Sequence, residues 1–150
     1  MSLSGRMMAA AACVAVLAAC DGDPLGIRGE RMELAQARQL WERQGTDDYR
    51  MTVRRTGAWF GGSAVIRVRD GVPVSVQPID PVDGVTPEVF GAYDTVEELF
   101  AIVENAMAEG ADRLDAEYHP RLGLPVDVYV DWADWADEEH GFVVEAFVRE

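Results

Sequence analysis

Three aspartates spaced three residues apart form the densest group of candidate metal ligands in this chain. Asp131, Asp134 and Asp137 share a segment with two tryptophans, and the segment ends at His140. Carboxylates in a bent loop could bring their oxygen atoms toward a hard cation such as calcium, although the spacing is not that of an EF-hand and the loop glycine of that motif is missing. The alternative is a solvated acidic loop whose tryptophans cover a sheet edge. We expect this alternative, and therefore no cofactor, and keep calcium as the competing hypothesis.

An aromatic pair between small residues is the second candidate site. Trp59 and Phe60 lie in the sequence Ala-Trp-Phe-Gly-Gly at the end of a predicted strand. Aromatic side chains at such a tip could anchor a protein partner or enter a membrane interface. The alternative is that both rings fold back onto the core. Trp59 and Phe60 are therefore candidate contacts with a partner or with a membrane.

Side chains for covalent chemistry are scarce. The sequence has 13 cationic side chains, and all of them are arginine, so a lysine nucleophile is absent. The two histidines, His119 and His140, have no partner at a spacing that would position a catalytic base. Ser63 and Ser75 lie outside any nucleophile motif, and no glycine-rich phosphate loop is present. We therefore expect a protein that is not an enzyme. A hydrolase with a pair of carboxylates is the alternative, because acidic residues are abundant.

The N-terminal segment predicts export and a lipid anchor. Leu17–Cys20 closes an apolar run of 13 residues that begins at Met7, which is too short for a spanning helix of about 20 residues. The sequence Leu-Ala-Ala-Cys resembles the lipobox of bacterial lipoproteins, in which the cysteine receives a diacylglycerol, the leader is cut before it, and the new amino terminus is acylated, for example with palmitate. Two or more acyl chains hold a protein stably on a membrane. An ordinary cleaved signal that happens to contain Cys20 is the alternative. Asp21 resembles an inner-membrane retention signal.

Length and charge limit the remaining possibilities. We expect a leader at residues 1–19, a lipidated cysteine with a flexible tether at residues 20–29, and one domain at residues 30–150, which is long enough for a hydrophobic core. The formal net charge of −14 argues against nucleic acid as a partner. Nine arginines against seven acids give residues 20–69 a net +2, whereas three arginines against twenty acids give residues 70–150 a net −17. The expected partners are the membrane of the cell envelope, through the anchor on Cys20, and an envelope protein on its periplasmic or exterior side.

Apolar periodicity predicts the order helix, three strands, helix, three strands. The first helix covers residues 30–43, and the second begins after Thr95 with a capping box to Glu98 and ends at Gly110. Strict alternation in the strands is typical of an antiparallel sheet with one covered face. We therefore predict a two-layer α+β domain with about six strands and both helices on one face. Outward arginines of the first half could form ion pairs with outward acids of the second half.

Alternation also predicts the register of the first hairpin and the inward residues of the last strand. In residues 64–76 we prefer a three-residue loop, Arg69 to Gly71, because it places three pairs of apolar residues on one face. In the last strand, alternation places Phe142, Val144, Ala146 and Val148 on the core side.

Five short motifs resemble those of the domain of unknown function family 6174, whose members are small bacterial secreted proteins and often lipoproteins. The motifs are Tyr49-Arg50, Val68-Arg69-Asp70-Gly71-Val72, Thr95-Val96-Glu97-Glu98-Leu99-Phe100, Tyr118-His119-Pro120-Arg121-Leu122-Gly123-Leu124-Pro125 and Asp137-Glu138-Glu139-His140-Gly141-Phe142. The resemblance covers roughly residues 35–148. Its motifs mark turns and helix starts, so they imply membership and do not imply an activity.

Overall fold

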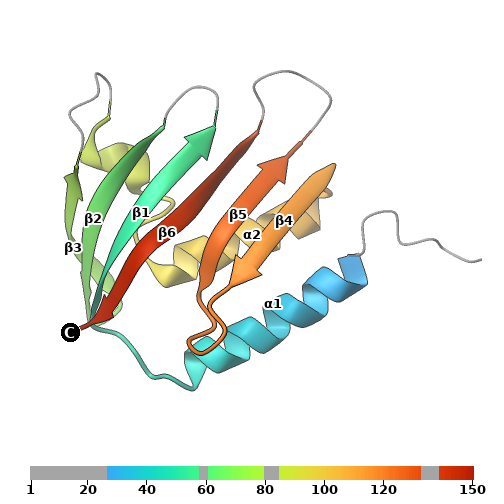
Figure 1. Ribbon diagram of the computed structural model, residues 1–150, viewed down its shortest axis with the longest axis horizontal. Helices are drawn as coiled ribbons and strands as arrows, with labels where there is room; N and C mark the ends of the chain where they lie inside the picture. Colours follow the sequence, from blue (N-terminus) through green and yellow to red (C-terminus); the bar gives the residue numbers. More distant parts are fainter. Residues whose placement is uncertain (1–26, 58–60, 80–84, 133–138) are drawn as a thin grey trace, which may run out of the picture.

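The computed structural model describes residues 27–57, 61–79, 85–132 and 139–150. Its elements, in chain order, are α1 (Ile27–Glu42), β1 (Tyr49–Gly57), β2 (Gly62–Arg69), β3 (Val72–Pro78), a short 3-10 helix η1 (Pro87–Phe90), α2 (Val96–Glu109), β4 (Arg113–Tyr118), β5 (Pro125–Asp131) and β6 (His140–Arg149). The six strands form one antiparallel sheet in the order β3-β2-β1-β6-β5-β4 (Figure 1). The pairing of β1 with β6 joins the two three-stranded halves.

Both helices lie on the same side of this sheet, as the sequence predicts (Figure 1). α1 contributes Leu34, Ala37 and Trp41 to the core, which is one stripe of the helix. α2 contributes the stripe Val96, Leu99, Phe100, Val103 and Ala106. We call the opposite side of the sheet, which no described helix covers, the open face.

The N-terminus of α2 is fixed by two hydrogen bonds. The Thr95 hydroxyl accepts from the backbone N–H of Glu98 at 3.1 Å, which confirms the predicted cap. The Tyr49 hydroxyl, from β1, accepts from the backbone N–H of Val96 at 2.9 Å. Burial raises the pKa of Tyr49 to about 12, because a phenolate would lose its solvation there. Gly110, with φ of 76°, ends the helix as predicted.

The turn between β4 and β5 contacts the backbone of α1. Gly123 has φ of 86°, and a Cβ built there would lie 2.2 Å from the carbonyl oxygen of Ala37. Glycine is therefore required for two reasons, a left-handed backbone and the space that a side chain would take from the helix. This contact places α1 against the second half of the sheet.

The predicted register of the first hairpin is wrong. Arg69 pairs with Val72 around a two-residue turn at Asp70 and Gly71, whose φ values are 49° and 72°. Positive φ at both turn residues is typical of the two-residue hairpin turns that match the twist of paired strands. A bulge opposite Arg67 and Val68 then places Val76 opposite Ile66, where the three-residue loop would have placed Val74. Val72 and Val74 are consequently 58% and 57% exposed instead of buried.

The predicted alternation in the last strand is also wrong after Val144. The register with β1 shifts between Thr52 and Val53, so Val53 pairs with Val144 and Thr52 pairs with Ala146. The extra residue, Glu145, reverses which positions point inward. Phe147 packs against the core beside Trp41 and Tyr49, while Ala146 and Val148 are exposed.

The first helix begins earlier than predicted. α1 starts at Ile27, so the last three residues of the predicted tether, 27–29, belong to the helix. No helix in the described part of the chain is long and apolar enough to cross a membrane.

Candidate anion-binding site on the open face

The open face is divided by charge. Outward positions of β1 and β2 carry Arg50, Arg54, Arg67 and Arg69, all on strands of the first half. Outward positions of β4 and β5 carry Asp115, Glu117 and Asp127. The uneven charge of the sequence therefore becomes a basic region and an acidic region of one surface.

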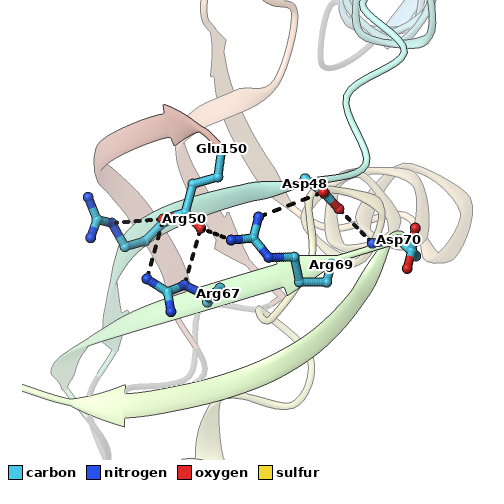
Figure 2. A network of polar contacts seen from close by, with 6 residues as sticks. All are labelled: Asp48, Arg50, Arg67, Arg69, Asp70 and Glu150. Carbon is cyan, nitrogen blue, oxygen red and sulfur yellow. Dashed lines mark hydrogen bonds and ion pairs between the residues drawn. The ribbon is translucent and has the colours of Figure 1, made fainter.

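Three of the arginines converge on one carboxylate (Figure 2). We call Arg50, Arg67 and Arg69 the arginine cluster. Glu150 Oε2 lies 3.2 Å from Nε of Arg67 and also contacts Nη2 of Arg69, while Glu150 Oε1 lies 3.8 Å from Nε of Arg50. The Glu150 side chain is 17% exposed, and the three arginine side chains are 38–47% exposed. The carboxylate is thus more buried than the cations that surround it.

The strands and the Asp70–Gly71 turn explain why these side chains meet. Arg50 and Arg67 are direct cross-strand partners in β1 and β2. Asp48 Oδ1 accepts from the backbone N–H of Asp70 at 2.8 Å, and its Oδ2 lies 3.8 Å from Nη1 of Arg69 (Figure 2). The backbone N–H of Glu150 donates to the carbonyl of Asp48 at 3.1 Å, which brings the end of β6 beside this turn.

The acidic region has fewer ion pairs. Glu117 and Asp127 are cross-strand partners, so two carboxylates of like charge face each other. Asp115 lies 2.7 Å from Nη2 of Arg113, and the Arg113 guanidinium lies 5.3 Å from the ring centre of Tyr129. These residues line an open depression of about 650 Å³. Acidic side chains alone do not identify a ligand, so we assign none to this depression.

The sequence-predicted site residues are only partly described by the structure. Cys20, Trp59, Phe60, Asp134 and Asp137 lie outside the described residues. Asp131 is the last residue of β5, is half-buried, and is the cross-strand partner of Arg113. Within the described residues, no three His, Cys, Asp or Glu side chains come together as a metal-binding group.

Both histidines have structural contacts. His119 Nδ1 accepts from the backbone N–H groups of Arg121 and Leu122, both at 3.2 Å, in the turn that follows β4. The His140 ring stacks on Trp132, with ring centres 6.3 Å apart and an interplanar angle of 13°. The acceptor role of His119 suits a turn residue, and an acidic side chain at this position could accept the same bonds.

A small pocket lies between α1, the end of α2 and β4. It measures about 180 Å³ and is lined in part by Glu30, Met107, Leu114 and Asp115. One oxygen of Glu30 is buried without a hydrogen-bond partner. Burial raises the pKa of Glu30, and the negative charges of Glu33 and Asp115 raise it further. The surroundings of Glu30 in this pocket therefore disfavour its charged form.

Sequence reasoning missed Glu150. It identified the outward arginines and the acidic residues of the second half, and one expected pair forms, between Arg54 and Glu145 at 2.9 Å. Glu150 gives no local signal, because it follows the last alternating residue and meets Arg67 from 83 positions away. Three outward arginines on neighbouring strands would repel one another, and this repulsion was the only sequence signal for an acidic partner.

Comparisons with known proteins address family membership. No curated protein and no solved structure matches the chain. The model of a family of unknown function, DUF6174, matches residues 33–149, which includes all six strands and most of α1. The chain therefore belongs to the DUF6174 family.

Proposed function

We propose that this protein is a lipid-anchored lipoprotein of the bacterial cell envelope, and that its domain is a non-catalytic module whose open face binds an envelope partner. The observation that carries the proposal is the open face itself. Six strands present a broad surface that no described helix covers, and this surface carries opposite charges in two regions. A sheet face with this charge pattern suits recognition of a partner of defined orientation.

The anchor part of the proposal is supported by the N-terminal sequence. Leu17–Cys20 has the lipobox pattern, and the domain begins at Ile27, shortly after the cysteine. An aspartate at position 21 slightly favours the inner membrane. Replacement of Cys20 by serine should abolish labelling with a radioactive fatty acid and release the domain from the membrane fraction. Labelling that persists in this variant would contradict the anchor.

The non-catalytic part is supported by the contacts of the groups that could otherwise react. His119 accepts two backbone hydrogen bonds, and His140 is stacked on Trp132. The carboxylates of Glu117 and Asp127 face an open surface instead of an enclosed substrate pocket. Turnover of an ester, phosphate or glycoside substrate that is lost in Glu117→Gln would support the hydrolase alternative instead.

The binding surface can be tested by crosslinking in intact cells. A photoreactive amino acid at Thr52, in the middle of the open face, should form an adduct with one partner, whereas the same probe at the exposed Gln39 of α1 should not. Ala146 is the β6 neighbour of Thr52 and is exposed, so Ala146→Arg should block the adduct without changing the melting temperature. Equal adducts from both positions, or an adduct that survives Ala146→Arg, would contradict the proposal.

The aromatic pair supplies a second, independent probe of the partner. Trp59 and Phe60 connect β1 to β2 and remain candidate partner or membrane contacts. In Trp59→Ala and Phe60→Ala we expect weaker co-purification of the partner at an unchanged melting temperature. A fall in melting temperature would instead indicate that the rings pack on the core.

A further inference from the structure

We propose that the arginine cluster is a binding site for a phosphate group and that the Glu150 carboxylate is its built-in competitor. The inference rests on the proposed function only in using the open face as a binding surface. It adds the chemistry of the ligand and a mechanism that regulates access to the site.

The local charge of the arginine cluster favours an anion. Arg50 and Arg67 face each other across two strands, an arrangement that is unfavourable for like charges unless an anion lies between them. The three arginines carry three positive charges, while Glu150 and Asp48 supply two negative side chains. The guanidinium groups of the cluster therefore outnumber the carboxylate side chains in contact with them, in a chain whose formal net charge is −14.

The number of hydrogen-bond donors also favours an anion. Three guanidinium groups offer fifteen N–H donors, whereas one carboxylate has about four acceptor positions. Among the described residues, Arg50 has no contact to a carboxylate shorter than 3.8 Å, which is longer than a hydrogen bond. A phosphate group carries more oxygen atoms and more charge than a carboxylate, and arginine binds both groups in a bidentate manner.

The arginine cluster is also accessible. The arginine side chains are 38–47% exposed, so a ligand can reach them from solvent. The main chain of Glu150 is held by its N–H bond to Asp48, whereas its side chain has, among the described residues, only the ion pairs with the cluster. An anion with more oxygen atoms and more charge than a carboxylate can replace these ion pairs with more hydrogen bonds to the same guanidinium groups. The carboxylate can therefore turn away and leave the cluster to an incoming anion.

The test is a titration with inorganic phosphate at constant ionic strength, followed by phosphorus NMR line broadening. The full-length protein is purified in non-ionic detergent, so that any attached lipid stays with it. Glu150→Gln removes the competing charge, so it should bind phosphate about tenfold more tightly than the wild type. Arg67→Gln should lose binding, because Arg67 contacts both oxygens of the resident carboxylate.

Matched controls come from the same face. Glu145→Gln also removes an acid paired with an outward arginine, but that acid contacts Arg54, which lies outside the cluster. Its phosphate affinity should equal that of the wild type. Equal affinity in wild type, Glu150→Gln and Arg67→Gln would overturn the site. Loss of binding in Arg67→Gln without a gain in Glu150→Gln would overturn the competitor role. Neither result depends on a protein partner, so failure here is distinguishable from failure of the crosslinking test.

A phosphate group could come from a soluble compound or from a lipid headgroup, and a second arm separates the two. The Glu150→Gln protein is placed in vesicles of a neutral, phosphate-free galactolipid, either alone, with added phosphatidylglycerol, or with a phosphate-free anionic lipid at the same charge, and the phosphate titration is repeated. Weaker phosphate binding only with phosphatidylglycerol supports the site and identifies the headgroup as its ligand. Unchanged binding supports the site and identifies a soluble phosphate compound.

Discussion

The covered face and the open face of the sheet differ in their contacts, because the covered face buries apolar side chains and the open face carries ion pairs. On the covered face, residues such as Val53, Ile66 and Phe142 are completely buried. On the open face, the main contacts are ion pairs of half-exposed arginines, either with the more buried Glu150 or with the half-exposed Glu145. Burial of an apolar side chain contributes about 1.5–3 kcal/mol, whereas an exposed ion pair contributes about 0–1 kcal/mol.

This difference separates stability from binding. Substitutions on the covered face should change the free energy of unfolding and leave the specificity of the open face intact. Substitutions on the open face should change binding and leave unfolding almost unaffected.

The largest effect is expected at the turn that contacts α1. Gly123→Ala combines a left-handed backbone with a clash against the Ala37 carbonyl, so we expect a loss of about 3 kcal/mol or more. Gly110→Ala is the matched control, because Gly110 also has positive φ but no atom within 4 Å of a built Cβ. Its loss should stay near 1 kcal/mol. Urea denaturation measures both, and equal losses would show that α1 does not constrain the turn.

A smaller effect is expected at the buried hydroxyl of the covered face. Tyr49→Phe leaves the Val96 N–H without its acceptor, which should cost about 1–3 kcal/mol. Tyr129→Phe on the open face is the control and should change stability by less than about 0.5 kcal/mol.

The same tyrosine predicts a pH dependence. Because the folded pKa of Tyr49 is raised from 10 to about 12, its contribution is complete below pH 10 and is lost as the pH rises toward 12. The loss should be about 1.4 kcal/mol for each pH unit in this interval. Tyr49→Phe should show a correspondingly flatter dependence in urea denaturation at alkaline pH. An identical slope in both proteins would contradict the raised pKa.

Removing a charge should change the stability in opposite directions in the two regions of the open face. Glu117→Gln relieves the repulsion with Asp127 and should stabilise the protein by a few tenths of a kcal/mol. Arg54→Gln removes the pair with Glu145 and should destabilise it by a similar amount. High salt should reduce both differences in melting temperature. If both variants were stabilised or both were destabilised, the predicted repulsion at Glu117 or the predicted attraction at Arg54 would be wrong.

The smallest effect is expected from calcium. Asp131 has Arg113 as its cross-strand partner, so a cation bound with Asp134 and Asp137 would sit near a positive side chain. We expect the melting temperature to be the same in calcium and in magnesium. A selective rise with calcium that Asp134→Asn and Asp137→Asn together abolish would establish the calcium hypothesis instead, because binding to the native state stabilises it.

Much of the fold follows from local sequence patterns. The order of elements, the cap at Thr95 and the end of α2 at Gly110 were predicted correctly, because each depends on residues close in the chain. The two errors in the strands begin differently, because the first hairpin turns through two residues instead of three, whereas β6 gains one residue at Glu145. A bulge opposite Arg67 and Val68 and another at Glu145 each insert one residue, and alternation alone cannot reveal an inserted residue.

The candidate site was less predictable than the fold. The outward arginines follow from alternation, but their convergence on Glu150 depends on β1 pairing with both β2 and β6. The pairing of β1 with β6 brings together residues about 80–100 positions apart, and no pattern within a single strand specifies it. The contact of Gly123 with α1 was missed for the same reason, although the glycine itself was visible in the turn.

The early start of α1 limits the distance between the domain and a lipid anchor on Cys20. Only six residues separate Cys20 from Ile27, so a lipid on Cys20 would keep the start of the helix within about 25 Å of the anchor even if the chain were fully extended. The helix itself is 16 residues, or about 24 Å, long. A partner in the same membrane would then meet the open face at a high effective concentration, and an interaction too weak to detect between free proteins in solution would be sufficient there.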